Sequence, residues 1–319
     1  MVKRQKIKGK NEMKNEKGLA KFIEVCGKGV GKIYEPIHLV RMAKARAKSM
    51  EIIAEAARNT NDVPMKIKFK DDSFATELET KEVQALCERA MGRDLYFKMI
   101  KQRNIESVIG KSYTELEDEE MISEEPVEQD WILRFFSYAE EVSDEDMQAL
   151  WASILAGEIK KPKSYSLRTL NTLRNLSKEE ALTFNKLQPL ILSRRSKRFV
   201  VSNLNTLEKY GVTYEDLLRL EECGLLCLQK SKINMNIPKN QTQIFLEYHK
   251  TLIGALSKSK QSEILELGVY FLTTAGVELS SFVDEKNDDY IFEIAEMLSK
   301  NDKIELTIFK VKENDNDQL

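Results

Sequence analysis

Apolar positions in the first third of the chain recur at helical spacing. Over 18–33 they fall every three or four residues with lysines between them, which is typical of an amphipathic helix. Pro36 interrupts this pattern and suits the first turn of a second helix, which is predicted over 37–59 and is rich in alanine. The stretch 63–72 alternates and fits a short strand or an extended connection, and a third long helix is predicted over 80–112.

Helix-start signals dominate the middle of the chain. Ser143 with Asp146, and Ser177 with Glu180, have the spacing of capping boxes, in which two side chains satisfy the first free N–H groups of a helix. Apolar residues follow both signals at helical spacing. Gly157 occupies a position suited to a left-handed helix end. These signals predict a compact helical bundle.

The pattern changes again after residue 198. Thr213 opens a short helix that passes into an apolar segment, and 264–282 favours a strand, a turn and a helix in succession. A helix over 290–298 and a strand over 303–311 complete the chain. A small α+β domain is therefore predicted at the C-terminal end.

Two stretches in which one sign of charge predominates complete the division into domains. The first 17 residues hold seven Lys or Arg against two Glu, and residues 114–130 hold nine acids and no base. Both compositions are typical of solvated, flexible segments. We predict a mainly α protein with a basic arm at 1–17, long helices at 18–113, an acidic linker at 114–129, a helical bundle domain at 130–197, and a small winged-helix-like α+β domain at 198–319.

Composition limits the classes of function. Charged residues make up 32% of the chain and the net charge is −2, so no global positive field attracts nucleic acid or membrane. The four cysteines are scattered, the N-terminal stretch is hydrophilic, and no long apolar run occurs. We expect a cytoplasmic protein, with peripheral contact at the inner face of the membrane as an alternative.

Several short strings around Trp151 carry a family resemblance. WILRFF at 131–136, ILAGE at 154–158 and SLRTL at 166–170 resemble an uncharacterised bacterial domain family of unknown function, a resemblance that extends over most of the chain. The string DEDMQALWASILA, followed by LSKEEA, is similar to the abortive-infection alpha proteins of bacterial phage resistance. Neither resemblance implies catalytic residues.

A polar group lies close to this signature. Glu158, Ser164, Ser166 and Arg168 would form a polar site if two helix ends met there. The favoured alternative is that the serines cap a helix while the Glu and the Arg pair at the surface. The candidate interaction residues are Trp151, Glu158, Ser166 and Arg168.

Side chains in patterns typical of catalytic or metal sites are sparse. Cys223 and Cys227 lie four residues apart, with His249 further along, but structural zinc needs four ligands and the chain has only two histidines. A pair of buried thiols is therefore favoured over a metal site. No phosphate-binding loop, nucleophile elbow or zinc-protease motif occurs. We expect no catalytic residue, no cofactor and no metal.

Two features bear on nucleic acid as a partner. The strings LLRLEECGLL and YFLTTAGVELSSF resemble the recognition helix and the wing of winged-helix proteins, but the acids around the first string would repel phosphates. The string SRRSKR is the one basic cluster, and a solvated loop between helices is its favoured interpretation. The candidate nucleic-acid residues are Arg194, Arg195, Lys197 and Arg198.

The N-terminal helix offers a different kind of surface. Three glycines at alternate positions weaken it by about 1 kcal/mol each relative to alanine, so its apolar face needs a cover. Packing within the protein or against a second subunit is favoured over an anionic lipid surface. The candidate residues for an oligomer or membrane contact are Phe22, Ile23, Gly27, Gly31 and Ile33.

These observations favour a non-enzymatic bacterial effector or adaptor in phage defence, which acts through contacts with another protein. The sequence does not identify that partner, and a homo-oligomer is a second expectation. The alternative function is a winged-helix DNA-binding regulator, although nucleic acid is the less favoured partner.

Overall fold

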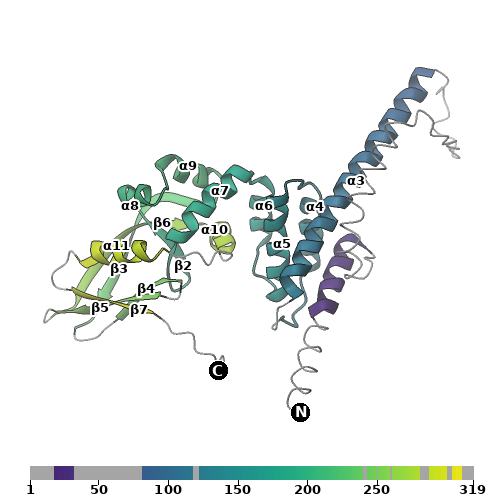
Figure 1. Ribbon diagram of the computed structural model, residues 1–319. Coiled ribbons are helices and arrows are strands. Elements are labelled where there is room, and N and C mark those ends of the chain that lie inside the picture. Colours follow the sequence, from purple (N-terminus) through teal and green to yellow (C-terminus); the bar gives the residue numbers. More distant parts are fainter. Residues whose placement is uncertain are drawn as a thin grey trace, which may run out of the picture. The chain divides into compact units, whose positions relative to one another are not determined.

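The computed structural model describes residues 18–31, 81–117, 122–239, 243–249, 251–258, 261–280, 287–299 and 304–310. The predicted helix over 37–59, the alternating stretch over 63–72 and the basic arm lie outside these residues. The chain divides into two units, Met1–Ser164 and Tyr165–Leu319 (Figure 1). Each unit is described by itself.

The described part of the first unit consists of helices. They are a helix over 18–30, α3 (Lys81–Glu117), α4 (Gln129–Ala139) and α5 (Glu145–Lys160). α3 confirms the third predicted helix and continues into the predicted acidic linker, whose first residues are therefore helical.

Local signals fix the ends of these helices. The Asp144 side chain caps α5 by accepting hydrogen bonds from the backbone N–H groups of Asp146 and Met147. Gly31 follows the 18–30 helix with a φ of 84°, a left-handed conformation that glycine adopts without a steric penalty.

Aromatic rings of α4 and α5 form the centre of the first unit. Trp131 stacks on Phe135 with ring centroids 5.1 Å apart, and Trp151 meets Phe135 edge-on at 5.3 Å. Gly29 approaches the neighbouring ring of Phe136 so closely that an added Cβ would lie 2.0 Å from a ring carbon. The helix that contains Gly29 is therefore packed directly against α4.

The second unit combines helices with a sheet. Its helices are α6 (Leu167–Asn175), α7 (Lys178–Leu187), the short 3-10 helix η1 (Gln188–Leu190), α8 (Leu204–Lys209), α9 (Tyr214–Glu222), α10 (Thr274–Leu279) and α11 (Asp288–Ser299). Its strands are β1 (Leu192–Arg194), β2 (Lys197–Val201), β3 (Leu226–Ile237), β4 (Gln243–Tyr248), β5 (Thr251–Ser257), β6 (Glu263–Leu272) and β7 (Ile304–Lys310).

The described strands form one antiparallel sheet in the order β3-β6-β2-β1-β4-β5-β7. β1 pairs with β4 through a single register pair, Ser193 opposite Glu247. Lys239, which follows β3, forms a parallel bridge with Ser257 at the end of β5. The sheet therefore curls until the end of β3 meets β5.

Buried and exposed side chains alternate along parts of the two longest strands, β3 and β6. In β3, Ile233, Met235 and Ile237 are buried while the residues between them are exposed. In β6, Leu265 and Leu267 are buried on either side of an exposed residue. This alternation places one row of apolar side chains in the core and the intervening polar row in solvent.

The predicted fold class, mainly α with a small winged-helix-like C-terminal domain, is wrong. The described sheet has seven strands and extends from Leu192 to Lys310, so the protein has a mixed α and β fold. The predicted bundle over 130–197 includes α4 and α5 of the first unit, and α6 and α7 of the second. The sequence pattern underestimated the sheet because several strands are short or pair with segments distant in sequence.

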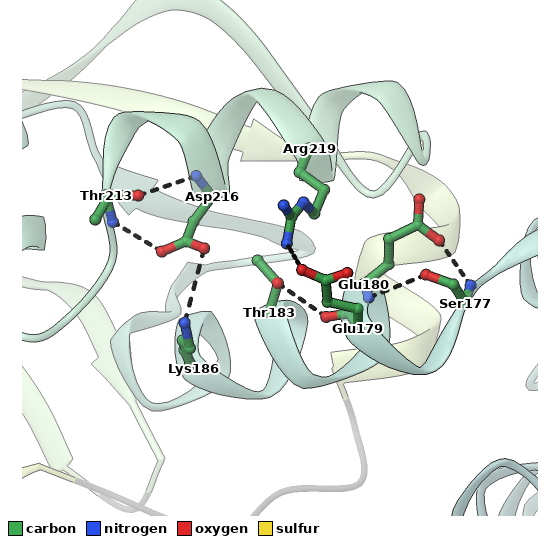
Figure 2. A network of polar contacts seen from close by, with 8 residues as sticks. All are labelled: Ser177, Glu179, Glu180, Thr183, Lys186, Thr213, Asp216 and Arg219. Carbon is green, nitrogen blue, oxygen red and sulfur yellow. Dashed lines mark hydrogen bonds and ion pairs between the residues drawn. The ribbon is translucent and has the colours of Figure 1, made fainter.

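Capping boxes start α7, where one was predicted, and α9, where only a helix start at Thr213 was predicted. Ser177 accepts from the backbone N–H of Glu180, whose side chain accepts from the backbone N–H of Ser177. Thr213 and Asp216 repeat this arrangement at the start of α9. Figure 2 shows the two boxes on neighbouring helices.

Candidate interaction surfaces

Trp151 and Glu158 lie in the interior of the first unit. The Trp151 side chain is 0% exposed, so it belongs to the core. Glu158 is 2% exposed, and its Oε1 accepts a hydrogen bond of 2.6 Å from the backbone N–H of Lys163. Lys163 has a positive φ of 69°. The Glu158 carboxylate therefore stabilises the turn after α5.

Ser166 and Arg168 belong to the second unit. Ser166 is the N-cap of α6, where its Oγ accepts a hydrogen bond from the backbone N–H of Thr169. Its own backbone N–H donates to Glu278 of α10 at 2.7 Å, and the Thr169 hydroxyl donates to the same carboxylate oxygen. Arg168 is exposed. Ser166 thus has a structural role, and sequence reasoning missed its partner Glu278 because 112 residues separate the two.

The basic cluster forms a β-hairpin between β1 and β2, not a loop between helices. Arg194 donates to a backbone carbonyl of β3, and Arg198 donates to the Ser280 hydroxyl at 2.6 Å. Arg195 and Lys197 are exposed, and Arg195 has a φ of 56° in the turn. Two of the four predicted nucleic-acid residues therefore hold the fold together.

α9 is fixed against α7 along its polar side (Figure 2). Arg219 donates to Glu179 at 2.8 Å, and Lys186 lies 3.8 Å from Asp216. Burial is the largest cause that raises the pKa of Cys223 to about 12. The Cys223 thiol is therefore neutral at physiological pH. The polar contacts between α9 and α7 show that the two helices pack as a pair.

The apolar face of the 18–30 helix is directed into the first unit. Phe22 is 1% exposed, and its ring centroid lies 5.8 Å from that of Tyr113 in α3. Ile23 is 38% exposed, and an added Cβ on Gly27 would meet no atom within 4 Å. Ile33 lies outside the described residues. The protein itself therefore covers the main apolar side chain of this helix.

Lys21 contributes to the same packing. Its Nζ donates to the backbone carbonyl oxygens of Ser123 and Ile159, at 2.6 and 2.9 Å. Burial, the largest effect, lowers its pKa. This ammonium group holds the end of α5 and the chain before α4, so it faces protein.

The packed half of α3 (residues 99–117) makes polar contacts with its neighbours. The Asn104 side chain donates to the backbone carbonyl of Glu140 at 2.9 Å. The Ser112 hydroxyl lies 3.0 Å from the carbonyl oxygen of Ala152 in α5 and 2.8 Å from that of Val108 in its own helix. These contacts fix the rotation of the packed half against α5.

The exposed half of α3 (residues 81–98) has the opposite character. Every side chain from Glu88 to Lys98 is exposed. Figure 1 shows this half extending past the other described helices of the unit. Its large apolar side chains have high exposed fractions: Leu86 58%, Met91 39%, Leu95 61%, Tyr96 59% and Phe97 52%.

The charges on the exposed half are nearly balanced. Over 88–98, Glu88 and Asp94 accompany Arg89, Arg93 and Lys98, and the Lys98 Nζ lies 2.7 Å from an Asp94 oxygen. Apolar side chains occur around the whole helix rather than in one stripe. A helix of this kind is usually covered by protein on more than one side.

The described residues form neither a membrane-spanning helix nor a metal-ligand cluster. None of the helices there has the length and apolar content needed to cross a membrane. Among the same residues, no three acidic, histidine or cysteine side chains gather where they could share a metal ion.

Comparison with known proteins places the chain in a family. The family described as "Protein of unknown function (DUF2806)" matches residues 88–295. The chain belongs to this family. The match includes α3 from Glu88 onward, all of α4 to α10 and most of α11. No curated protein and no solved structure matched the chain. Membership confirms the resemblance to a family of unknown function, and the similarity to abortive-infection alpha proteins stays a prediction.

Proposed function

We propose that this protein is a non-enzymatic adaptor of bacterial phage defence that binds another protein through the exposed half of α3. The observation that carries the proposal is the exposure of Leu86, Leu95, Tyr96 and Phe97, each by more than half, on one helix. Clustered large apolar side chains mark interaction sites, and aromatic residues are frequent among their energetic centres. The similarity to abortive-infection alpha proteins supports the role in phage defence.

The chemistry of the surface favours a protein partner. Over 88–98, two acids and three bases leave an excess of one positive charge, and one acid–base pair is already formed. Phosphate backbones and anionic lipids attract surfaces with a larger positive excess. An apolar partner surface would instead remove Leu95, Tyr96 and Phe97 from water, at roughly 25 cal/mol for each Å² of apolar area buried.

Phage plating tests the proposal. Bacteria that express the full chain should plate phage less efficiently than bacteria with an empty vector. The double substitution Leu95→Asp with Phe97→Asp should abolish this protection, because it places charge in the binding surface. Leu182→Asp is the matched control, since Leu182 is also exposed, at 54%, but lies on α7.

Each outcome bears on a different part of the proposal. Unchanged plating with the wild-type chain would contradict a role in phage defence. Protection by the double variant equal to that of the wild type would contradict the α3 surface. An electrophoretic shift of genomic DNA at low salt, where charge attraction is strongest, would support the DNA-binding alternative instead.

A further inference from the structure

A hollow of about 660 Å³ lies beside α11 in the second unit. α8 and the chain at either end of it contribute Lys209 and Tyr210, and α11 contributes Asp289, Phe292 and Glu293. A smaller hollow of about 210 Å³ shares lining residues with the first and extends toward β6. The two together form an open groove along one side of α11.

Glu293 organises the floor of this groove. It accepts hydrogen bonds from the Lys209 Nζ at 2.5 Å and from the Tyr210 hydroxyl at 3.1 Å. The hydrogen bond from Lys209 is the largest cause that lowers the pKa of Glu293. The one cation of the lining is therefore already paired, and Glu293 is committed to the fold.

Two further carboxylates flank Glu293 on the same helix face. Asp289 and Glu296 lie one helical turn before and after it, so they are about 10 Å apart along the axis at a rise of 1.5 Å per residue. Neither forms an ion pair with any residue that the structure describes. Phe292 lies between them and is 55% exposed. α11 contains no Lys or Arg.

We propose that this face of α11 docks a basic amphipathic helix of a partner protein. The docked helix would carry two Lys or Arg residues seven positions apart and a large apolar side chain between them. Two turns of helix reproduce the spacing of Asp289 and Glu296, and the apolar side chain would cover Phe292. Helices laid into grooves commonly use such regularly spaced anchors.

Other ligands fit this arrangement less well. Carboxylates separated by two helical turns cannot both coordinate one metal ion, because metal–oxygen bonds measure roughly 2.0–2.6 Å. A polyamine would satisfy the two charges but would leave Phe292 exposed to water. The contribution of Phe292 to affinity therefore distinguishes a docked helix from a small cation.

Peptide binding to the full chain tests the proposal. The probe is a fluorescent, alanine-based helical peptide with two lysines seven positions apart and a leucine four positions after the first lysine. Its binding is measured by fluorescence anisotropy. Asp289→Asn and Glu296→Gln should each weaken its binding about two- to fivefold, as expected for exposed ion pairs. Phe292→Ala should weaken it about five- to tenfold, as expected for an aromatic anchor.

Matched variants on α9 serve as controls. Glu215→Gln removes an exposed negative charge and Tyr214→Ala removes an exposed ring, and neither residue lines the groove. Both should bind the peptide as the wild type does. Unchanged melting temperatures for all five variants would exclude unfolding as the cause of any loss.

Three results would overturn the proposal. They are no detectable binding of the lysine peptide, equal binding of a counterpart with glutamine at both lysine positions, and equal losses in the groove and control variants. Spermidine that competes fully with the peptide, together with an unaffected Phe292→Ala variant, would assign the groove to small cations instead. These outcomes do not depend on the α3 surface, which belongs to the other unit.

Discussion

The two halves of α3 differ in what their polar side chains reach. In the packed half, Asn104 and Ser112 bond to backbone groups of neighbouring segments, and Ile109 is 2% exposed. In the exposed half, the one described ion pair joins Asp94 to Lys98 within the same helix. One continuous helix therefore belongs to the core at one end and exposes large apolar side chains at the other.

This difference shows that apolar content alone does not decide burial. The exposed half carries five large apolar side chains that are exposed, and its described polar contacts do not extend to another element. Buried polar groups need partners with defined geometry, so they specify which segments come together. We expect mutations in the packed half and its surroundings to affect stability, and mutations in the exposed half to affect binding.

Trp151→Ala should have the largest effect on stability. Trp151 is fully buried beside Phe135, and α5, which carries it, packs on the packed half of α3. Loss of the indole should lower the free energy of unfolding by about 3–5 kcal/mol, measured by urea denaturation. An unchanged transition would show that the core of the first unit lies elsewhere.

Paired alanine substitutions test the cover over the 18–30 helix. Gly29→Ala should destabilise the protein by about 1–3 kcal/mol, because its Cβ would collide with the Phe136 ring. Gly27→Ala should stabilise it by up to about 1 kcal/mol, since the added methyl group meets open space and alanine favours helix. Thermal melts that show equal effects for the two variants would contradict this packing.

Ser112→Ala should have a smaller effect, about 1 kcal/mol, because it leaves the Ala152 carbonyl without its side-chain donor. Thr114→Ala is the matched control. Within the described part of the chain, its hydroxyl bonds only to a carbonyl of its own helix, at Gly110, and it is exposed. Urea denaturation of both variants measures the difference, and equal stabilities would remove the role assigned to polar contacts between helices.

Leu95→Ala and Phe97→Ala should change the free energy of unfolding by less than about 0.5 kcal/mol. Both side chains are more than half exposed, so truncation creates no cavity. A loss of several kcal/mol in urea denaturation would show that part of the protein covers these residues. Small losses together with reduced phage protection would sharpen the contrast between the two halves.

Helix positions were predicted well where local chemistry determines them. The capping box predicted at Ser177 and the helix start predicted at Thr213 are both confirmed, and each depends on residues three positions apart. The box predicted at Ser143 is wrong by one residue, because Asp144 caps α5 while Ser143 accepts a hydrogen bond from Asn104. The stop predicted at Gly157 is also wrong, since α5 continues to Lys160.

Strands and sites were harder to predict because distant segments create them. The alternation of Ile233, Met235 and Ile237 is a signal for a strand, but only an apolar segment was predicted in the region of β3. The two terminal elements, α11 and β7, were predicted nearly at their observed bounds. The groove beside α11 had no sequence signature, because it forms only when α8 lies next to that helix.

β1 and β4 are joined by a single pair of residues, fewer than join any other two neighbouring strands of the described sheet. On one side, β2 and β3 each pair with β6; on the other, β5 pairs with both β4 and β7. Each side can therefore gain most of its hydrogen bonds before the other is complete. Folding would proceed from two nuclei that merge late, and amide protons on either side would exchange as separate cooperative groups.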